Sequence, residues 1–296
     1  MLSVIIPAFN EEKTIPAAAD TISSILKEAG IDAELLFVDD GSRDSTWATI
    51  LARAEKNPMV HGIHFSRNFG KEAAVFAGLS EAKGDCAVVI DCDLQHPPGK
   101  IVEMYRLWEQ GYEIVEGVKA DRGTETFMRR FAAKSFYAMI SAAVGIDMSR
   151  ASDFKLLDRK AVNVLINMPE KNAFFRALSS WIGFKTTAVE YEVQDRIAGE
   201  SKWSTKALIR YAISNIAEFS AAPLLAIVFF GCLFILLALI TGIIAIRTEG
   251  DWLSLKMLVC LSSGILMIGL GAAGYYIARI YDEIKGRPRF IISERI

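Results

Sequence analysis

The sequence predicts an α/β domain, in which helices cover both faces of a Rossmann-like and mostly parallel sheet, followed by a two-helix transmembrane hairpin. Two observations lead to this fold class. Short apolar runs alternate with segments of helical periodicity from Leu2 to Ile90, and two long apolar segments, 224–246 and 256–278, lie near the C-terminus. Such alternation is typical of parallel strands joined by helices.

Each element of the alternating region has its own signal. In chain order we expect a strand at 2–6, a helix at 15–29, a strand at 33–38, a helix at 45–56, a strand at 60–65, a helix at 71–82 and a strand at 86–90. Pro7 ends the first strand, and Gly30 stops the first helix. Because ligands of such sheets bind beyond the carboxyl ends of the strands, we expect the polar residues there to meet in one crevice.

The two apolar segments are long enough to cross a membrane. At about 1.5 Å per residue, each would cover roughly 34 Å, against a hydrocarbon core of about 30 Å. Two core helices of a soluble protein are the alternative, but segments that are hydrophobic on all sides favour a membrane. Cations flank the pair on its outer sides, which indicates that both flanks are cytoplasmic. These cations are Lys202, Lys206, Arg210, Arg279, Lys285, Arg287, Arg289 and Arg295.

We therefore expect a multi-pass protein of the inner (plasma) membrane with its main domain in the cytoplasm. The predicted parts are a domain at 1–202, a juxtamembrane amphipathic helix at 203–222, the hairpin within 223–279 and a basic cytoplasmic tail at 280–296. The net charge of −2 and scattered Lys and Arg give no reason to expect nucleic-acid binding. The four cysteines lack metal-type spacing, and free thiols in a reducing compartment account for them.

The segment after the fourth strand has the clearest chemistry. Asp91 and Asp93, with Gln95 two residues on, offer hard oxygen ligands that suit Mg²⁺ or Mn²⁺ together with diphosphate oxygens. The pair Asp39 and Asp40 follows a neighbouring strand and strengthens this interpretation. Turn carboxylates that cap helices are the alternative. His96 is interpreted as a loop residue, since no second histidine is suitably placed.

Four motifs in this order resemble those of a known family. They are Val4–Glu12, Val38–Ser42, Asp91–Pro98 and Arg196–Lys202. The chain resembles the family 2 glycosyltransferases with a GT-A fold, and within them the polyprenyl-phosphate type, which includes bactoprenol glucosyltransferases and dolichol-phosphate mannosyltransferases. The resemblance extends from Ser3 to about Pro223, and the paired spans suit the bactoprenol branch.

The resemblance implies a reaction and a set of site residues. One sugar would pass with inversion from a nucleotide diphosphate donor, UDP-glucose or another UDP-hexose, to polyprenyl (undecaprenyl) phosphate, for cell-envelope glycan modification. The implied donor-binding residues are Pro7, Phe9, Glu11, Asp39, Asp40, Asp91 and Cys92. The implied metal ligands are Asp91, Asp93 and Gln95. Arg196 and Lys202 would close over donor phosphates or guide the acceptor phosphate. Arg67 and Lys71 could face diphosphate, or form a solvated helix start.

By the same resemblance, Asp153 matches the position of the base proposed for the bactoprenol branch. A phosphate monoester has a second pKa of about 6, so the acceptor needs little activation. Asp153 is therefore expected to act as base or as aligning carboxylate. Asp158 is the second candidate, and an N-cap of a helix at 154–165 is the alternative role for Asp153.

A basic cluster interleaved with aromatic residues is the candidate site for the acceptor phosphate. It consists of Lys119, Arg122, Arg129 and Arg130. This composition is expected of an element that meets anionic lipid head groups, although an amphipathic helix with a solvated basic face would look the same. Glycines at 264, 269, 271 and 274 would permit close helix packing within or between subunits, which leaves a homo-oligomer open.

Three other functions fit the sequence less well. A dinucleotide-dependent dehydrogenase would carry G-x-G-x-x-G after the first strand, where Pro7–Glu11 stands instead. A processive polysaccharide synthase would have more spans, and the sequence lacks a Q-x-x-R-W motif. A non-catalytic membrane scaffold would have no need of the carboxylate set.

Overall fold

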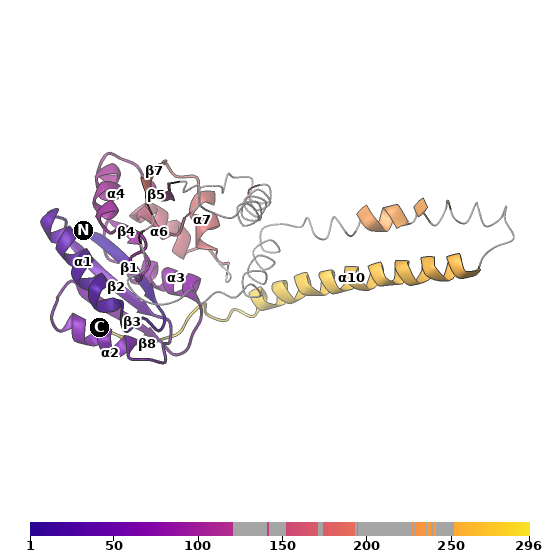
Figure 1. Cartoon of the computed structure of the whole chain (residues 1–296), viewed down its shortest axis with the longest axis horizontal. Coiled ribbons are helices and arrows are strands. Elements are labelled where there is room, and N and C mark those ends of the chain that lie inside the picture. Colours follow the sequence, from indigo (N-terminus) through magenta and orange to yellow (C-terminus); the bar gives the residue numbers. More distant parts are fainter. Residues whose placement is uncertain are drawn as a thin grey trace. The chain divides into compact units, whose positions relative to one another are not determined.

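The structure is a computed structural model that divides into two units (Figure 1). One unit is Met1–Thr205 together with Pro288–Ile296, and the other is Lys206–Arg287. The residues it describes are 1–120, 141, 152–170, 174–192, 194, 227, 229–234, 236–237, 240 and 252–296.

In the part of the chain that the structure describes, eight strands form one sheet in the order β7-β5-β6-β4-β1-β2-β3-β8. The strands are β1 (Leu2–Ala8), β2 (Ala33–Asp39), β3 (Val60–Phe65), β4 (Cys86–Val89), β5 (Ile114–Lys119), β6 (Lys155–Asp158), β7 (Thr186–Tyr191) and β8 (Ile292–Arg295). Strands β1 to β4 are mutually parallel, as is the pair β5 and β7, whereas β6 and β8 run antiparallel to their neighbours. The predicted mostly parallel α/β sheet is thus confirmed.

Helices cover the sheet in two groups. The described helices are α1 (Ile15–Glu28), α2 (Thr46–Ala54), α3 (Lys71–Glu81), α4 (Gly99–Glu109), α6 (Arg159–Ile166), α7 (Phe175–Trp181) and α10 (Trp252–Ile284). Helices α1, α2 and α4 pack together, and α3, α6 and α7 form a second group. Because both faces of β1 and β2 are covered, these strands are almost entirely buried, which explains their unbroken apolar sequence.

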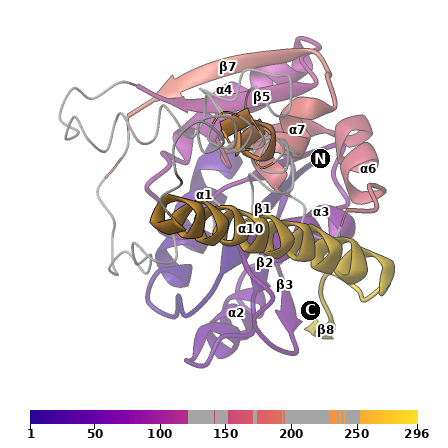
Figure 2. The ribbon, with the colours of Figure 1, turned by 90° about the vertical axis from the view of Figure 1, so that its right-hand side faces the viewer.

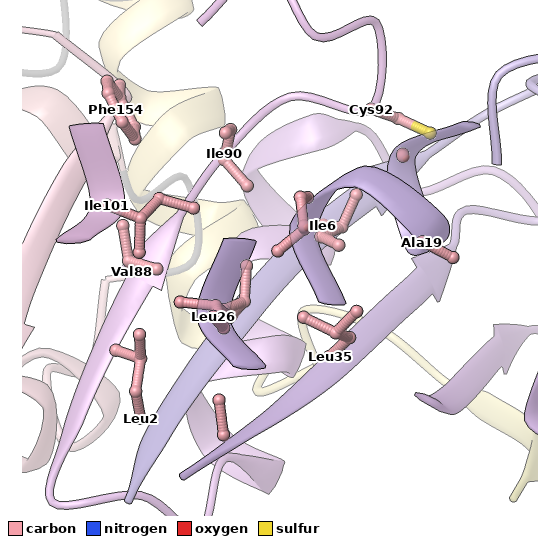
Figure 3. Close-up of a cluster of buried hydrophobic side chains, with 14 of the residues drawn as sticks. Leu2, Ile6, Ala19, Leu26, Leu35, Val88, Ile90, Cys92, Ile101 and Phe154 are labelled. Atoms are coloured by element: carbon pink, nitrogen blue, oxygen red, sulfur yellow. The ribbon is translucent and has the colours of Figure 1, made fainter. Parts of the chain in front are cut away.

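The main core lies between the sheet and the group formed by α1, α2 and α4 (Figure 3). Leu2 and Ile6 of β1 and Val88 of β4 meet Leu26 of α1 and Ile101 of α4, and all five side chains are fully buried. Burial of one such side chain contributes about 1.5–3 kcal/mol, so this core supplies a large part of the stability of the sheet and its loops.

Strand β6 differs from the expectation for this region. The alternative role for Asp153, the N-cap of a helix at 154–165, is wrong, because a strand occupies 155–158 and helix α6 begins only at Arg159. Asp158 caps that helix by accepting a hydrogen bond from Lys160 N at 2.8 Å. The apolar run Phe154–Leu157 fits a buried strand as well as a helix, and the sheet contacts decide between them.

The C-terminal residues also differ from the expected basic tail. Helix α10 continues to Ile284, and Gly286, at a φ of 62°, follows its end. The chain then returns to the first unit as β8, which pairs antiparallel with β3 and lies at the end of the sheet (Figure 2). Phe290 and Ile292 pack against the small apolar cluster around Phe65, and this burial stabilises the segment on the sheet.

Among the described residues of the second unit, one helix is long and apolar enough to cross a membrane, at Leu261–Ile284. It overlaps the expected span 256–278. For the other expected span, 224–246, the described residues 227, 229–234, 236–237 and 240 are helical, and the rest lies outside the described part. The two-helix hairpin therefore stays a prediction. The juxtamembrane helix expected at 203–222 lies wholly outside the described residues.

Candidate active site

The loops that follow β1 and β2 are tied to each other by backbone and side-chain hydrogen bonds. Asn10 N donates to Ser42 Oγ at 2.8 Å, and Arg43 N donates to Asn10 Oδ1 at 2.9 Å. Glu11 N donates to Thr46 Oγ1 at 2.8 Å. Asn10 itself has a φ of 53°, a left-handed conformation that asparagine tolerates better than most residues. The two loops thus form one fixed wall beyond the carboxyl ends of the strands.

Asp39, which ends β2, is completely buried and held from two sides. Its Oδ1 accepts a hydrogen bond from Ser42 N at 3.1 Å, and its Oδ2 lies 2.7 Å from His64 Nδ1 on β3. Asp39 therefore orders the turn that follows β2 and connects it to the neighbouring strand.

Asp40 ties the same turn to the loop before α3. Its two oxygens accept hydrogen bonds from Phe69 N at 2.6 Å and from Gly70 N at 2.9 Å. Burial raises the pKa of Asp40 to about 6, although both hydrogen bonds oppose that rise. Gly41, at a φ of 64°, lies so close to the backbone of Arg67 that a Cβ atom would clash. The expected phosphate-facing loop of Arg67 and Lys71 is thus fastened to the Asp39–Asp40 turn.

The turn after β4 presents Asp91 and Asp93. Gln95 N donates to Asp93 Oδ1 at 3.1 Å, and Leu94 has a φ of 55°, a strained left-handed value for a residue with a branched side chain. The side chain of Cys92 points into the core (Figure 3). Its thiol sulfur lies 3.3 Å from Thr14 Oγ1. The Cys92 side chain is buried, and this burial raises its pKa to about 12.

The antiparallel direction of β6 brings Asp153 to this turn. Lys155, at the start of β6, pairs with Val89 at the end of β4, so Asp153 lies just beyond the end of β4. Asp158 pairs with Cys86 at the opposite end and receives a hydrogen bond from Trp108 Nε1 at 2.8 Å. Of the two carboxylates considered in the sequence, Asp153 lies near Asp91 and Asp158 does not.

Lys71, the first residue of α3, joins Asp91 to Asp153. Its Nζ lies 2.6 Å from Asp91 Oδ1 and 3.0 Å from Asp153 Oδ2. Burial lowers the pKa of Lys71, but the attraction of the two carboxylates outweighs it and holds the pKa above its usual value. Lys71 is therefore a cation paired with both carboxylates, although its side chain is still partly exposed to solvent. The choice between a diphosphate-facing cation and a solvated helix start stays a prediction.

Arg176 of α7 is a site residue that sequence reasoning missed. It meets Asp153 with two hydrogen bonds, from Nε to Oδ1 at 2.6 Å and from Nη2 to Oδ2 at 2.7 Å. Burial would raise the pKa of Asp153, but Lys71 and Arg176 together hold it well below its usual range. The one sequence signal was an arginine within the apolar run 173–178, because a cation in such a run needs a partner.

A buried ion pair holds helix α7 in place. Lys155 Nζ, completely inaccessible to solvent, lies 2.6 Å from Glu116 Oε1. The same Nζ donates to Ser179 Oγ at 2.9 Å and to Ser180 Oγ at 3.0 Å. Because Ser179 and Ser180 lie one turn after Arg176, these contacts fix the helix from which Arg176 reaches Asp153.

The N-terminus of α7 is held by Glu72. Glu72 Oε2 accepts a hydrogen bond from Phe175 N at 2.9 Å. Burial, and then the charge of Asp153, raise the pKa of Glu72 to about 7. Helix α7 is therefore attached to α3 at its start and to β6 along its length.

His96 is a buried loop residue, as interpreted from the sequence. Its ring stacks on Phe154 with 5.1 Å between centroids and meets Tyr191 edge-on at 5.4 Å. Burial lowers the pKa of His96. The ring thus packs the Asp91–Asp93 turn against the residue that follows Asp153.

The other predicted residues fall into two groups. Pro7, Phe9 and Glu11 lie at the end of β1 and are half-buried, and Lys119 is exposed at the end of β5. Arg67 lies with its Cζ 4.1 Å from the ring centroid of Phe69. Arg122, Arg129, Arg130, Arg196 and Lys202 lie outside the described residues.

The carboxylates on the turn after β4 suit a divalent cation whose other ligands come from a substrate and from water. Among the described residues there is no group of three or more His, Cys, Asp or Glu side chains able to hold a metal ion. Asp91 and Asp93 nevertheless provide two carboxylates on one turn. Mg²⁺ is usually bound by one or two carboxylates, with phosphate oxygens and water completing its shell.

Comparison with known proteins settles the family. Residues 3–179 match the family described as glycosyl transferase family 2. The chain belongs to this family. The resemblance drawn from the four motifs is thereby confirmed, and this family 2 glycosyltransferase is an enzyme.

Relatives of this glycosyltransferase match it over nearly its whole length. An uncharacterized glycosyltransferase of Bacillus subtilis (strain 168), YkcC, is 38% identical over 300 residues, which are 99% of this chain and 93% of that protein. A prophage bactoprenol glucosyl transferase homolog of Escherichia coli (strain K12) is 36% identical over 99% of this chain and 98% of that protein. A bactoprenol glucosyl transferase of Shigella phage SfV is 35% identical over the same shares.

Solved structures share the fold of the glycosyltransferase domain. Glucosyl-3-phosphoglycerate synthase from Mycobacterium tuberculosis, in complex with Mn²⁺, uridine diphosphate and phosphoglyceric acid, aligns with a TM-score of 0.53 and 23% identity over 73% of this chain and 76% of that chain. Mannosyl-3-phosphoglycerate synthase from Rubrobacter xylanophilus aligns with a TM-score of 0.50 and 17% identity over 74% of this chain and 72% of that chain. The α/β domain is therefore GT-A-like.

Proposed function

We propose that this glycosyltransferase moves one hexose from a UDP-hexose to the phosphate of a membrane polyprenol and inverts the anomeric carbon. The observation that carries the proposal is the placement of Lys71 between Asp91 and Asp153, with Arg176 behind Asp153. Two cations among carboxylates, beyond the ends of parallel strands, suit a reaction in which both reactants bring phosphate. Relatives named bactoprenol glucosyl transferases support the lipid acceptor.

In the proposed reaction the acceptor phosphate attacks the sugar directly, and UDP is the leaving group. An oxygen of the acceptor phosphate forms a bond to the anomeric carbon, the bond from that carbon to the donor diphosphate breaks, and its electron pair leaves on UDP. Because the acceptor oxygen is largely anionic at neutral pH, no strong base is needed. Asp153, held ionised by Arg176 and Lys71, is suited to alignment rather than to proton uptake.

Asp91 and Asp93, with Gln95 as the third expected ligand, would hold Mg²⁺ or Mn²⁺. The ion would neutralise negative charge on the departing diphosphate. Lys71 contributes a positive charge beside Asp91, and its half-exposed side chain would be able to reach a phosphate oxygen bound there. The mycobacterial synthase that shares the fold was crystallised with Mn²⁺ and UDP, in keeping with this choice of ion and nucleotide.

The donor nucleoside would lie against the wall formed by the loops after β1 and β2. Pro7, Phe9 and Glu11 lie at its edge, and Asp39 and Asp40 set its shape. Arg67, beside Phe69, and Lys71 would then face the diphosphate. Arg196 and Lys202 would close over the donor phosphates or guide the acceptor phosphate.

Chain connectivity supports a membrane hairpin. Residues 206–287 leave the first unit and rejoin it at Pro288, so both ends of this segment belong to the same unit. If α10 crosses the bilayer, a second crossing between 206 and 251 has to bring the chain back to the same side. The predicted span 224–246 is the apolar segment available for it. We therefore propose two spans, with the catalytic unit at the inner face of the plasma membrane.

An assay with full-length protein in detergent tests the proposal. Labelled UDP-glucose and other UDP-hexoses are offered with undecaprenyl phosphate and Mg²⁺, and products are separated by thin-layer chromatography. A lipid carrying a single sugar is expected. A long polymer would indicate a processive synthase, and no turnover with any donor would indicate a scaffold. Charge reversal at Arg129 and Arg130 is expected to raise the acceptor KM, and an unchanged KM would place the lipid phosphate elsewhere.

A further inference from the structure

The C-terminal segment 290–296 lies against the donor side of the site, although it follows the second unit in the chain. In the antiparallel pair of β8 with β3, Arg295 stands opposite Ile63, Glu294 opposite His64, and Ile292 opposite Phe65. Successive side chains of a strand point to opposite faces of the sheet, so this segment reaches both faces of β3.

On the face of α2, contacts run from Glu294 to Asp39. Trp47 Nε1 donates to Glu294 Oε2 at 3.0 Å, a contact between residues 247 positions apart in the chain. The Trp47 ring stacks on His64 with 5.2 Å between centroids, and His64 Nδ1 lies 2.7 Å from Asp39 Oδ2. Ser293 Oγ donates to the carbonyl oxygen of His64 at 3.0 Å. The segment therefore holds His64 by its ring and by its backbone.

On the face of α3, a second series of contacts begins at Phe290. Its ring stacks on Phe65 with 5.3 Å between centroids and 5° between planes. Phe65 meets Phe69 edge-on at 5.7 Å, and Arg67 lies over the Phe69 ring. Through Phe65 and Phe69, the C-terminal segment therefore supports the loop that carries Arg67 toward the proposed diphosphate site.

We propose that residues 290–296 are a positioning element for the nucleotide of the donor, acting through Trp47 and His64 on Asp39 and through Phe65 and Phe69 on Arg67. The inference rests on the proposed function, which assigns Asp39 and Arg67 to the donor. Its basis is that both series start in the same short segment and end at two different donor-side loops.

The described contacts connect the C-terminal segment to Asp39 through Trp47 and His64. One oxygen of Asp39 is held by His64, whose ring stacks on Trp47, and Trp47 is oriented by the hydrogen bond to Glu294. Loss of the acceptor at Glu294 removes the hydrogen bond that orients the indole and weakens its stack on His64. The Asp39 oxygen that faces His64 then loses an ordered partner, and the turn held by the other oxygen shifts with the carboxylate.

The test measures UDP binding by isothermal titration calorimetry on full-length protein with Mg²⁺, alongside the KM for donor and acceptor. We expect Glu294→Ala to weaken UDP binding and raise the donor KM by about fivefold, the effect of losing one ordering hydrogen bond. The kcat at saturating donor and the acceptor KM are expected to stay unchanged. Trp47→Phe, which keeps a ring on His64 but loses the indole N–H, is expected to show the same split.

Two variants serve as controls. Glu294→Gln keeps an oxygen that accepts from Trp47 and is expected to retain wild-type UDP affinity. Arg295→Ala removes an exposed ion pair with Glu81, 3.0 Å apart, on the same strand but the other face, and is expected to leave UDP affinity unchanged.

The outcomes separate the two proposals. If wild type binds UDP, and Glu294→Ala and Trp47→Phe bind it equally well, the positioning role is overturned while the proposed function stands. Equal weakening by Arg295→Ala would also overturn it, because fraying of β8 would then explain every variant. Wild type that binds no UDP would overturn the donor assignment and this inference together. Should Glu294→Ala fail to fold, Trp47→Phe against Arg295→Ala decides.

Discussion

The two sides of the site are held together in different ways. On the side proposed to bind the donor, Asp40 accepts hydrogen bonds from two backbone N–H groups, at Phe69 and Gly70. On the other side, Asp153 is held by the long side chains of Lys71 and Arg176, which are 39% and 31% exposed. Backbone groups cannot exchange partners without moving the chain, whereas lysine and arginine can. The first side is therefore rigid, whereas the side chains of the second side would be able to change partners when a phosphate group binds.

The largest effect is expected where the movable side meets the proposed metal. Asp91→Asn or Asp93→Asn should lower kcat by about 10³-fold or more, because the charge that neutralises the leaving diphosphate is lost. Steady-state kinetics over a series of Mg²⁺ and Mn²⁺ concentrations measures this. Wild-type rates for either variant in the presence of a chelator would refute the metal role of the pair.

A smaller loss is expected at Asp153. Asp153→Asn should lower kcat by about 10²-fold while the donor KM changes little, because alignment of the acceptor is lost. Since the pKa of wild-type Asp153 lies well below its usual range, the group stays ionised and contributes no acid limb to kcat between about pH 5 and pH 8. Asp158→Asn, at the other end of β6, is the matched control and should leave kcat unchanged. A variant at Asp153 as fast as wild type would remove this residue from the site.

On the fixed side, loss of Asp40 should reduce stability as well as activity. Asp40→Ala leaves two buried N–H groups without an acceptor, which costs about 2 kcal/mol of unfolding free energy. Because the folded-state pKa of Asp40 is raised to about 6, its favourable contribution is largest at low pH and falls as pH rises through 6. Chemical unfolding should therefore show a greater loss at about pH 5 than at about pH 8. An equal loss of stability at both pH values would contradict a buried Asp40 carboxyl with a raised pKa.

The smallest effect is expected at Glu72, which lies between the two sides. The pKa of Glu72 is about 7 in the folded protein, so the folded protein keeps this proton to a higher pH than the unfolded chain does. The stability of the fold therefore decreases as pH rises through 7. Glu72→Gln keeps an oxygen for Phe175 N and removes the charge. It should raise the unfolding free energy by about 1 kcal/mol at pH 8 and have little effect at pH 5. Thermal melts at both values test this, and stabilisation at pH 5 alone would show that the sign is reversed.

The sequence predicted the part of the site that depends on local patterns. Strands β1 to β4 are short apolar runs that end at carboxylates, and parallel order places those ends at one edge. Asp91, Asp153 and Lys71 do meet there. The signal for Asp91 was the spacing of carboxylates after an apolar strand, whereas Asp153 and Lys71 were expected from the resemblance to the bactoprenol branch.

Arg176 and β8 could not be predicted in this way. Arg176 acquires its role from Asp153, 23 positions earlier, through packing of α7 that depends on the buried Lys155 and Glu116 pair. Residues 290–296 alternate apolar and polar side chains only briefly, among basic residues, and read as a tail. In both cases a tertiary contact, and not a local pattern, decides the structure.

The return of β8 to the sheet also sets an order of events during biosynthesis. Strand β3 is synthesised long before β8, and the whole of α10 is made between them. Until β8 has been made, the outer edge of β3 exposes unpaired backbone groups of the kind that recruit other strands. Closure of this edge therefore requires the chain beyond residue 292, and a nascent chain stalled before that residue would keep the edge open.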